Sequence, residues 1–444
     1  MEDDAVEVSS VQALVQVLNA NDPLRPNVDC AIDGDEELEL LEGVRLALAL
    51  SSNTSVSSLA LRRGLCTSTL AILLEAIKHN TVLQTLTIHA AYTSMGDETG
   101  VAMAEVLHRV ATLRSVSIDA SWTRMGDETG RAMADALKRN ATLQSFSIQA
   151  WHAHMRDGTG VAVADALKHH AALRSFRIDA GHSKMGDETG VAMADALKHN
   201  ARLQSFSIDA VCSRMGDEAG VAMADALRHN AALQSFSISA WDTEMGDGTG
   251  VALADALKKN AALLSFSIHA QETRMGDATG VAMADALKHN SALRSLCIHV
   301  EETQMGDETG VAMAEALEHN CTLQSLCIYA EETLMGEKTT SAMAGALRRN
   351  VTLEAVSIKT PTARTGHEAR TALREAMEQT ALRNRALREQ RQTLLQLAAW
   401  DDHAAFRSLK ERAFRNKVFE FFFPPVRAFQ PLDAARGRAS RALG

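Results

Sequence analysis

Cysteine, positive charge and long apolar runs are all scarce in this sequence. Six cysteines are spread unevenly over 444 residues, which excludes a small secreted domain held together by disulfides. The formal net charge is −11, so the molecule as a whole is a poor binder of nucleic acid. No apolar run reaches the roughly 18 residues of a membrane-spanning helix, so we expect no transmembrane segment.

Signal-peptide and enzyme signatures are also absent. The chain starts Met1-Glu2-Asp3-Asp4, which is acidic where a secretory signal would be basic, so we expect a soluble, cytoplasmic protein. There is no Gly-x-x-x-x-Gly-Lys-Ser/Thr, His-Glu-x-x-His, Cys-x-x-Cys or Gly-x-Ser-x-Gly. We therefore predict that the protein is not an enzyme and has no cofactor and no metal site.

What the sequence does contain is a repeat. Blocks of equal length, such as 201–230 and 231–260, follow one another without a slip from residue 81 to residue 350, and the units are counted from Leu83 to Leu353. Upstream, Leu59 and Leu61 lie slightly closer to their equivalents Leu86 and Ile88, which fits a shorter unit. Residues 22–53 fit one more unit, with Val28 and Cys30 on its strand.

Each unit has two halves with different periods. Phe206 and Ile208 alternate with polar residues, which predicts a half-buried strand over 203–210. Met223 and Leu227 then lie four residues apart, which predicts a short amphipathic helix. Asp217 is predicted to cap the start of this helix, and Asn230 to close it in a left-handed conformation.

A strand and a helix in every block predict a solenoid. One unit buries about six large apolar side chains, at roughly 1.5–3 kcal/mol each, and ordering its residues costs several times more in total. No unit is therefore stable alone, and each has to share its core with its neighbours. We predict about 10–12 strand–helix units, with a parallel sheet on the concave side, helices on the convex side and a helical C-terminal segment.

The unit resembles the leucine-rich repeats of the ribonuclease-inhibitor-like class. The resemblance rests on Leu203, Phe206 and Ile208, on Met215 to Glu218, and on Ala224 to Asn230, and it covers about residues 53–360. It implies a horseshoe that binds proteins, as in ribonuclease inhibitor, Ran-type GTPase activators, tropomodulin-like actin regulators and the sensor arrays of NOD-like receptors. These functions differ, so the fold does not choose among them.

The sequence departs from that class at one position. Where the family has Asn three residues after the second strand apolar residue, this chain has Ala91, Ser121 or Trp151. We therefore do not expect the family's buried Asn ladder.

The residues that vary among the repeats are candidates for partner binding. Two rows of outward strand positions are nearly all serine, for example Ser205 and Ser207, and carry little recognition information. Variation gathers at the strand ends and in the loops that follow, where binding residues on rigid scaffolds usually lie. Drift at positions without packing constraint is the alternative. The candidates are Trp122, Trp151, His152, Asp179, Asp209, Trp241, Asp242, His269, Glu272, His299, Glu302, Tyr329 and Glu332.

Other recurring groups have simpler interpretations. Asp and His four residues apart, such as Asp195 and His199, are expected to form weak pairs on a solvated helix face. Cys297 and Cys327 occupy equivalent sites on adjacent strands, where a disulfide or shared thiol site is conceivable and two reduced thiols are expected. The stripes of Met are expected in the core.

The composition divides the chain into four segments. Residues 1–52 are assigned to an N-terminal cap, with a short helix over 7–18, and a degenerate repeat; residues 53–380 to the repeats. Residues 381–430 form a basic, aromatic cap or tail, because 381–444 hold 13 Lys and Arg against 6 Asp and Glu and contain seven of the 12 Phe. Residues 431–444 are expected to be disordered.

We therefore predict a non-enzymatic protein-interaction scaffold whose partner is another protein. One alternative is a regulator of a small GTPase resembling the Ran-type activators, whose chemistry is supplied jointly with the GTPase. A second alternative is a membrane-surface adaptor that contacts anionic lipid weakly through residues 381–430. The sequence does not indicate the identity of the partner, the oligomeric state or the biological process.

Overall fold

A computed structural model of the chain describes residues 6–8, 11–22, 27–30, 40–61 and 66–399. Contacts divide the chain into two units, residues 1–384 and residues 385–444. The first unit contains the repeats and is the one described below. The predicted disordered end, 431–444, and residues 400–430 of the predicted basic segment lie outside the described residues.

The strands form one parallel sheet of 13 strands in sequence order. From β4 onward, each residue of a strand pairs with the residue at the same position of the next block, as Phe206 does with Phe236. The register of the sheet therefore follows the repeat period of the sequence. The strands are β1 (Val6–Val8), β2 (Asn27–Cys30), β3 (Ser58–Leu61), β4 (Thr85–His89), β5 (Ser115–Asp119), β6 (Ser145–Gln149), β7 (Ser175–Asp179), β8 (Ser205–Asp209), β9 (Ser235–Ser239), β10 (Ser265–His269), β11 (Ser295–His299), β12 (Ser325–Tyr329) and β13 (Ala355–Lys359).

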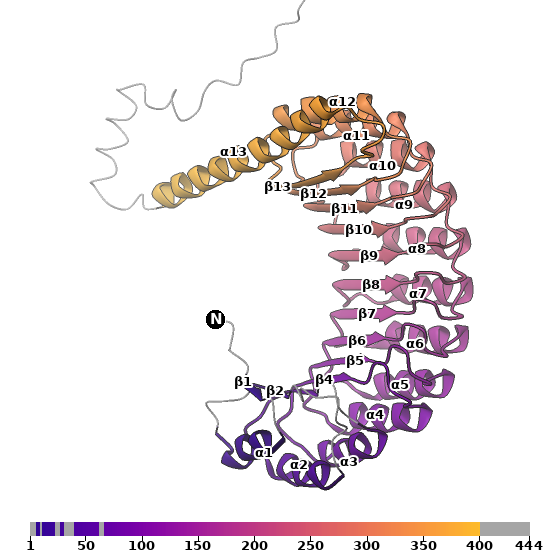
Figure 1. Ribbon diagram of the computed structural model, residues 1–444, viewed down its shortest axis with the longest axis vertical. Helices are drawn as coiled ribbons and strands as arrows, with labels where there is room; N and C mark the ends of the chain where they lie inside the picture. The colour runs from indigo at the N-terminus through magenta and orange to yellow at the C-terminus, as the bar shows by residue number, and fades with distance from the viewer. Residues whose placement is uncertain (1–5, 9–10, 23–26, 31–39, 62–65, 400–444) are drawn as a thin grey trace, which may run out of the picture. The chain divides into compact units, whose positions relative to one another are not determined.

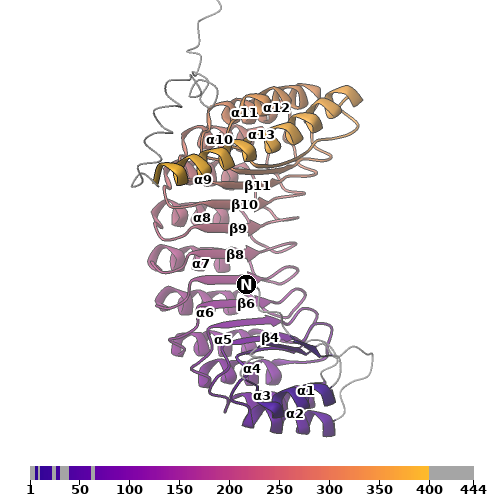
Figure 2. The same cartoon turned by 90° about the vertical axis from the view of Figure 1, so that its left-hand side faces the viewer.

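The helices alternate with the strands. Within the first unit, Figure 1 shows the sheet on the inner side of the curve and the helices on the outer side, and Figure 2 looks onto the stacked strands. The helices are α1 (Val11–Ala20), α2 (Leu40–Ser52), α3 (Thr67–Ile77), α4 (Asp97–Arg109), α5 (Asp127–Arg139), α6 (Asp157–His169), α7 (Asp187–His199), α8 (Asp217–His229), α9 (Asp247–Lys259), α10 (Asp277–His289), α11 (Asp307–His319), α12 (Glu337–Arg349) and α13 (His367–Ala399).

This arrangement confirms the predicted α/β solenoid with leucine-rich-repeat-like units. The predicted strand around Val28 and Cys30 is β2, which pairs with β3. The expected helix over residues 7–18 is partly wrong, because Val6–Val8 is a strand and the helix begins at Val11. The N-terminal segment is therefore built of strand–helix units like the rest of the array.

The core is continuous from repeat to repeat. Phe146, Phe176, Phe206, Phe236 and Phe266 are buried and stack along the array, with neighbouring ring centroids 5.8–6.2 Å apart. The two Met stripes are buried as predicted. Each ring is thus covered by the equivalent ring of the next unit, which is why one unit alone has no complete core.

An Asn ladder, which we did not expect, joins the repeats through residues that were predicted only to end the helices. Asn230 ends α8 in extended backbone, with φ −84° and ψ 114°, so the predicted left-handed conformation is wrong. Its buried side chain donates to the Leu197 carbonyl at 2.6 Å and accepts from the backbone N–H of Leu233 at 2.8 Å. The ladder therefore lies at the helix ends, before the strands, and not after them.

The recurring Asp also has a role that sequence reasoning missed. Gly216 is the N-cap of α8, and Asp217 is the first helical residue. Asp217 Oδ1 accepts hydrogen bonds from Gly246 N at 2.9 Å, Thr249 N at 2.9 Å and Thr249 Oγ1 at 2.6 Å. The Asp of one repeat thus caps the helix of the next repeat. Burial alone would raise the pKa of Asp217, but these hydrogen bonds outweigh it and lower that pKa.

We call these hydrogen bonds from Gly246 and Thr249 to Asp217 the inter-repeat clasp, and a glycine makes room for it. A Cβ added at Gly220 would lie 2.1 Å from Thr249 Oγ1, so only glycine lets the two helices approach with the threonine between them. The Gly-Asp-Glu-Thr-Gly sequence is therefore an inter-repeat joint.

The start of α13 covers the last repeat. Leu373 and Ala376 are buried, Thr380 Oγ1 donates to the Leu347 carbonyl at 2.8 Å, and Asn384 Nδ2 donates to the Leu353 carbonyl at 2.9 Å. The change in composition near residue 380 lies inside this helix and is not a change in secondary structure.

Candidate functional site

The outward face of the sheet offers little variety. Ser205, Ser235 and Ser265 are register partners on successive strands, and the next outward row continues with Ser207, Ser237 and Ser267. These side chains are partly exposed in a pattern that alternates with the buried core residues. The variety of side chains lies instead at the strand ends and in the loops.

The loop after each strand from β4 to β12 contains one residue in the left-handed region, with φ between 50° and 61°. None of these nine residues is Gly or Asn, the types that adopt this conformation most readily. We name this row the ridge. The ridge residues are Tyr92, Trp122, His152, His182, Cys212, Asp242, Glu272, Glu302 and Glu332.

The ridge is an ordered structure, because a second backbone ladder holds it. The N–H of Trp122 donates to the Trp151 carbonyl at 2.8 Å, and the N–H of Cys212 donates to the Trp241 carbonyl at 2.8 Å. The same bond recurs from Tyr92 to Glu302, so each of these loops is bonded to the following loop in the same way as the strands are. The side chains of the ridge are held at a regular spacing along the array.

The N-terminal half of the ridge is aromatic. Tyr92 stacks on Trp122 with centroids 6.0 Å apart, Trp122 lies over His152 at 3.9 Å, and His152 stacks on His182 at 4.2 Å. Trp151, the loop residue before His152, meets His182 edge-on at 5.1 Å. Tyr92 remains 77% exposed and Trp122 43% exposed, so this is an open aromatic surface.

The C-terminal half of the ridge is acidic. Asp242, Glu272, Glu302 and Glu332 follow one another, and Trp241 Nε1 donates to Glu272 Oε1 at 2.9 Å. The pKa of Glu302 is raised, first by the charge of Glu272 and also by Glu332. Like charges are therefore held near one another, which is the electrostatic pattern of a surface that receives a cation.

A third group of candidates lies on the strand ends beside the ridge. Asp179 and Asp209 are register partners on β7 and β8. Burial, and then the charge of Asp209, raise the pKa of Asp179 to about 6.

The strand ends of β10 to β12 continue this row with three stacked rings. His269 stacks on His299 with centroids 4.2 Å apart, and Tyr329 follows at 4.4 Å. Lys359 Nζ lies 4.4 Å from the centre of the Tyr329 ring.

The 13 predicted candidates thus fall on the ridge, on the loop position just before it, or on the strand ends. The 13 candidates do not include Tyr92, His182 and Cys212, which the structure places on the same row. The signal for them was present, because each occupies the same position of its block as Trp122. Whether any of these residues binds a partner stays a prediction.

The two thiols on β11 and β12 lie close together at the outward face. Cys297 and Cys327 are register partners, and both are free. Burial and the neighbouring Cys327 raise the pKa of Cys297 to about 12. Burial also lowers the pKa of His269 and His299, so both imidazoles are neutral at pH 7.

The Asp–His pairs on the helices are exposed. His199 Nδ1 lies 3.3 Å from Asp195 Oδ1, with both side chains about half exposed. The same Asp195 meets Lys168 of the preceding repeat at 2.7 Å. Exposed pairs of this kind contribute little to stability.

Comparisons with known proteins add little about function. No protein-family model matches the sequence, and no curated protein matches it. Among solved structures the chain is similar to Leiomodin-1 Actin-Binding Site 2 (ABS2), at 26% sequence identity and a TM-score of 0.28, over 33% of this chain and 82% of that one. A TM-score this low carries no argument about function.

Among the helices that the structure describes, none combines the length and apolarity needed to cross a membrane. The predicted membrane-surface segment, 381–430, lies largely outside the described residues.

Proposed function

We propose that this chain is a non-enzymatic, cytoplasmic scaffold of the ribonuclease-inhibitor-like class that binds another protein along the ridge. The observation that supports the proposal most is the backbone of the ridge. Nine successive repeats place a residue other than Gly or Asn at φ 50–61°. A left-handed residue of this kind costs on the order of 1–3 kcal/mol, although Asp and His tolerate it better than Trp, Tyr or Glu.

This cost distinguishes binding from drift. If the ridge side chains had no use, glycine would relieve the backbone at every position, and it would cost little packing at the exposed residues Asp242, Glu272, Glu302 and Glu332. Drift would then introduce glycine or asparagine into the row. The row instead holds large aromatic side chains at one end and carboxylates at the other. Side chains kept against a backbone cost are typical of functional positions.

The two halves of the ridge define the chemistry of the partner. Tyr92 and Trp122 provide exposed rings that suit an apolar anchor or the stem of an arginine. Glu272, Glu302 and Glu332 suit lysine and arginine side chains. Trp122 follows β5 and Glu272 follows β10, so at about 4.8 Å per strand the two halves are centred about 24 Å apart. We infer a partner with an apolar anchor and a basic patch separated by about that distance.

Glycine substitutions on the ridge test the proposal. The Trp122→Gly/Glu302→Gly chain should remain folded, because both changes relieve a left-handed residue and this relief offsets the ring contacts that Trp122 makes with Tyr92 and His152. It should retain at least tenfold less of the partner that the full chain captures from cell extract. Ser237→Ala, on the serine row, is the matched control and should retain the partner.

Partner retention by the double glycine variant would refute the ridge as the binding surface. The identity of the captured protein separates a general scaffold from the regulator of a small GTPase. Capture should also weaken with added salt if the acidic half contributes, because exposed charges are screened.

A further inference from the structure

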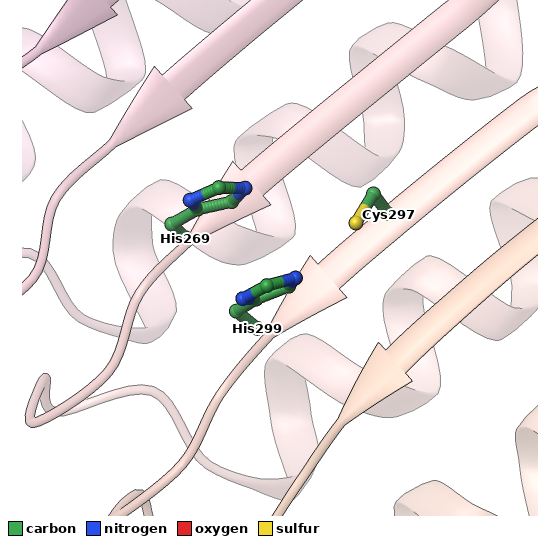
Figure 3. A group of neighbouring side chains, drawn as sticks. All are labelled: His269, Cys297 and His299. Atoms are coloured by element: carbon green, nitrogen blue, oxygen red, sulfur yellow. The ribbon is translucent and has the colours of Figure 1, made fainter. Parts of the chain in front are cut away.

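Thiol and imidazole side chains meet on the outward face of β10, β11 and β12. His269 ends β10, His299 ends β11, and Cys297 lies two residues before His299 on the same side of the sheet (Figure 3). Cys327 is the register partner of Cys297 on β12. Three adjacent strands thus bring two sulfurs and two ring nitrogens to one place, although their residues are far apart in the sequence.

The distances within this group are short. The candidate ligand atoms of His269, Cys297 and His299 all lie within 4.8 Å of one another. Cys327 Sγ lies 3.7 Å from His299 Nε2. His299 is therefore the centre of the group, in contact with a thiol on the next strand and stacked on the imidazole of the preceding one.

These distances suit a tetrahedral ion. With bonds of about 2.3 Å to sulfur and about 2.0–2.1 Å to nitrogen, tetrahedral Zn²⁺ separates a sulfur from a nitrogen by about 3.6 Å. The Cys327–His299 separation of 3.7 Å already matches this value. The ligand atoms of His269, Cys297 and His299, which lie within 4.8 Å of one another, would have to move about 1 Å closer together, and Cys327, which lies outside that group of three, would have to turn toward them. Two thiolates and two imidazoles are a donor set that zinc prefers over magnesium or calcium.

The group is specific to this place in the array. The same outward row holds Ser207, Ser237 and Ser267 on the three strands before β11. Another strand-end histidine, His89 on β4, has Thr87 two residues before it. Cysteine and histidine therefore coincide only on β10 to β12 among the described strands β3 to β13.

Charged side chains of both signs act on this group: Lys359 acts on His299, and Arg177 acts on His269. Glu301, in the loop after β11, acts electrostatically on both His269 and Cys297. The negative charge of a nearby carboxylate partly balances the charge of a bound cation. The sheet fixes the strand spacing at about 4.8 Å, so the ligands come from a rigid support.

We propose that Cys297, Cys327, His269 and His299 bind one Zn²⁺ ion on the outward face of the solenoid. The site is separate from the ridge that forms the proposed partner surface, and it does not depend on that function. A bound zinc ion would tie β10, β11 and β12 together by side chains in addition to their backbone ladder.

Metal titration of the full chain tests this proposal. The reduced, metal-free chain is titrated with Zn²⁺ by calorimetry and with Co²⁺ by absorption spectroscopy. We expect one equivalent of Zn²⁺ to bind, and the Co²⁺ complex to show intense tetrahedral bands with a thiolate charge-transfer band. Cys297→Ser/Cys327→Ser should weaken Zn²⁺ binding at least about 100-fold and abolish the charge-transfer band.

Matched variants keep the test decisive. A chain with Cys66, Cys212 and Cys321 changed to Ser and a His89→Gln chain should bind Zn²⁺ like the unmodified chain. His299→Gln should lose binding while its circular dichroism is unchanged, because the side chain is on the outward face. Loss of binding in the control chains, retention in the Cys297→Ser/Cys327→Ser chain, or a Cys297–Cys327 disulfide in the freshly isolated chain would each overturn the proposal.

Discussion

Replacing Gly220 by alanine is expected to destabilise the array, whereas the same replacement at Gly158 is expected to stabilise it. Both glycines lie in the first turns of repeat helices. At Gly220 an added Cβ would lie 2.1 Å from Thr249 Oγ1 and 2.4 Å from its Cγ2, and at Gly158 it would meet nothing within 4 Å. The pair therefore compares one substitution with and without a steric conflict.

The loss of unfolding free energy expected for Gly220→Ala depends on the contacts that Thr249 would lose. Thr249 is fully buried, and its Oγ1 donates to Asp217 at 2.6 Å, so the side chain cannot rotate away without breaking that bond. Overpacking costs about 1–3 kcal/mol and a hydrogen bond to a charged group about 1.5–3 kcal/mol. Alanine returns about 1 kcal/mol of helix propensity. We expect a net loss of about 1.5–5 kcal/mol for Gly220→Ala and a gain of up to about 1 kcal/mol for Gly158→Ala.

Urea unfolding of the full chain, followed by circular dichroism, measures both effects. Because each repeat contacts only its neighbours, Gly220→Ala should also lower the cooperativity of the transition. A Gly220→Ala chain as stable as the unmodified one would refute the inter-repeat clasp. Equal destabilisation by both substitutions would refute the steric explanation.

Two further predictions concern pH. His170→Asn should stabilise the chain by about 1 kcal/mol, because His170 stands where neighbouring repeats have the ladder Asn and its buried Nε2 makes no hydrogen bond within the described residues. Burial lowers the pKa of His170, so the unfolded chain binds more protons below about pH 6.5. The gain from His170→Asn should therefore grow between pH 7 and pH 5, and a gain equal at both pH values in urea unfolding would contradict this. Asp179 has a pKa raised to about 6 in the folded chain. Its protonation therefore stabilises the folded state at low pH, and this stabilisation is lost as the pH rises through about 6. Asp179→Asn should be more stable relative to the unmodified chain at pH 8 than at pH 5, and a pH-independent difference in unfolding midpoints would show that Asp179 is not buried beside a like charge.

The repeat period and the alternation of apolar and polar residues were enough to predict most of the fold. Phe206 and Ile208 on one face of a strand, followed by Met223 and Leu227 at helical spacing, are local patterns that report burial directly. The stacking of the units was predictable because one unit buries too little apolar surface to offset the cost of ordering its residues. The N-terminal strand Val6–Val8 was missed because it is short and pairs only with β2, which its own sequence does not show.

The joints between repeats could not be assigned by local reasoning. Asp217 has the residue type and position of an N-cap, yet its carboxylate reaches the helix of the next repeat. Asn230 has the type and position of a left-handed helix end, yet its side chain bridges two repeats. In both cases the same residue type suits a bond within its own helix end and a bond to the next repeat. Only the distance between neighbouring repeats shows which bond forms.

The candidate site was predicted in part. Variation among the repeats pointed to the loops, because residues such as Trp122 and Glu302 lie outside the buried core that the repeats share. The left-handed backbone of the ridge was not predictable, since Trp and Glu are among the residue types that rarely adopt it. The approach of Cys297 to His269 was also missed, because it depends on the register between two strands.

A comparison of stability and partner capture in the Trp122→Gly/Glu302→Gly chain decides whether the ridge is a binding surface. If the ridge side chains are kept for binding against a backbone cost, this chain will remain folded in a urea titration and will lose the partner that the unmodified chain and Ser237→Ala retain. Undiminished capture of that partner by a folded Trp122→Gly/Glu302→Gly chain would show that the ridge does not bind it.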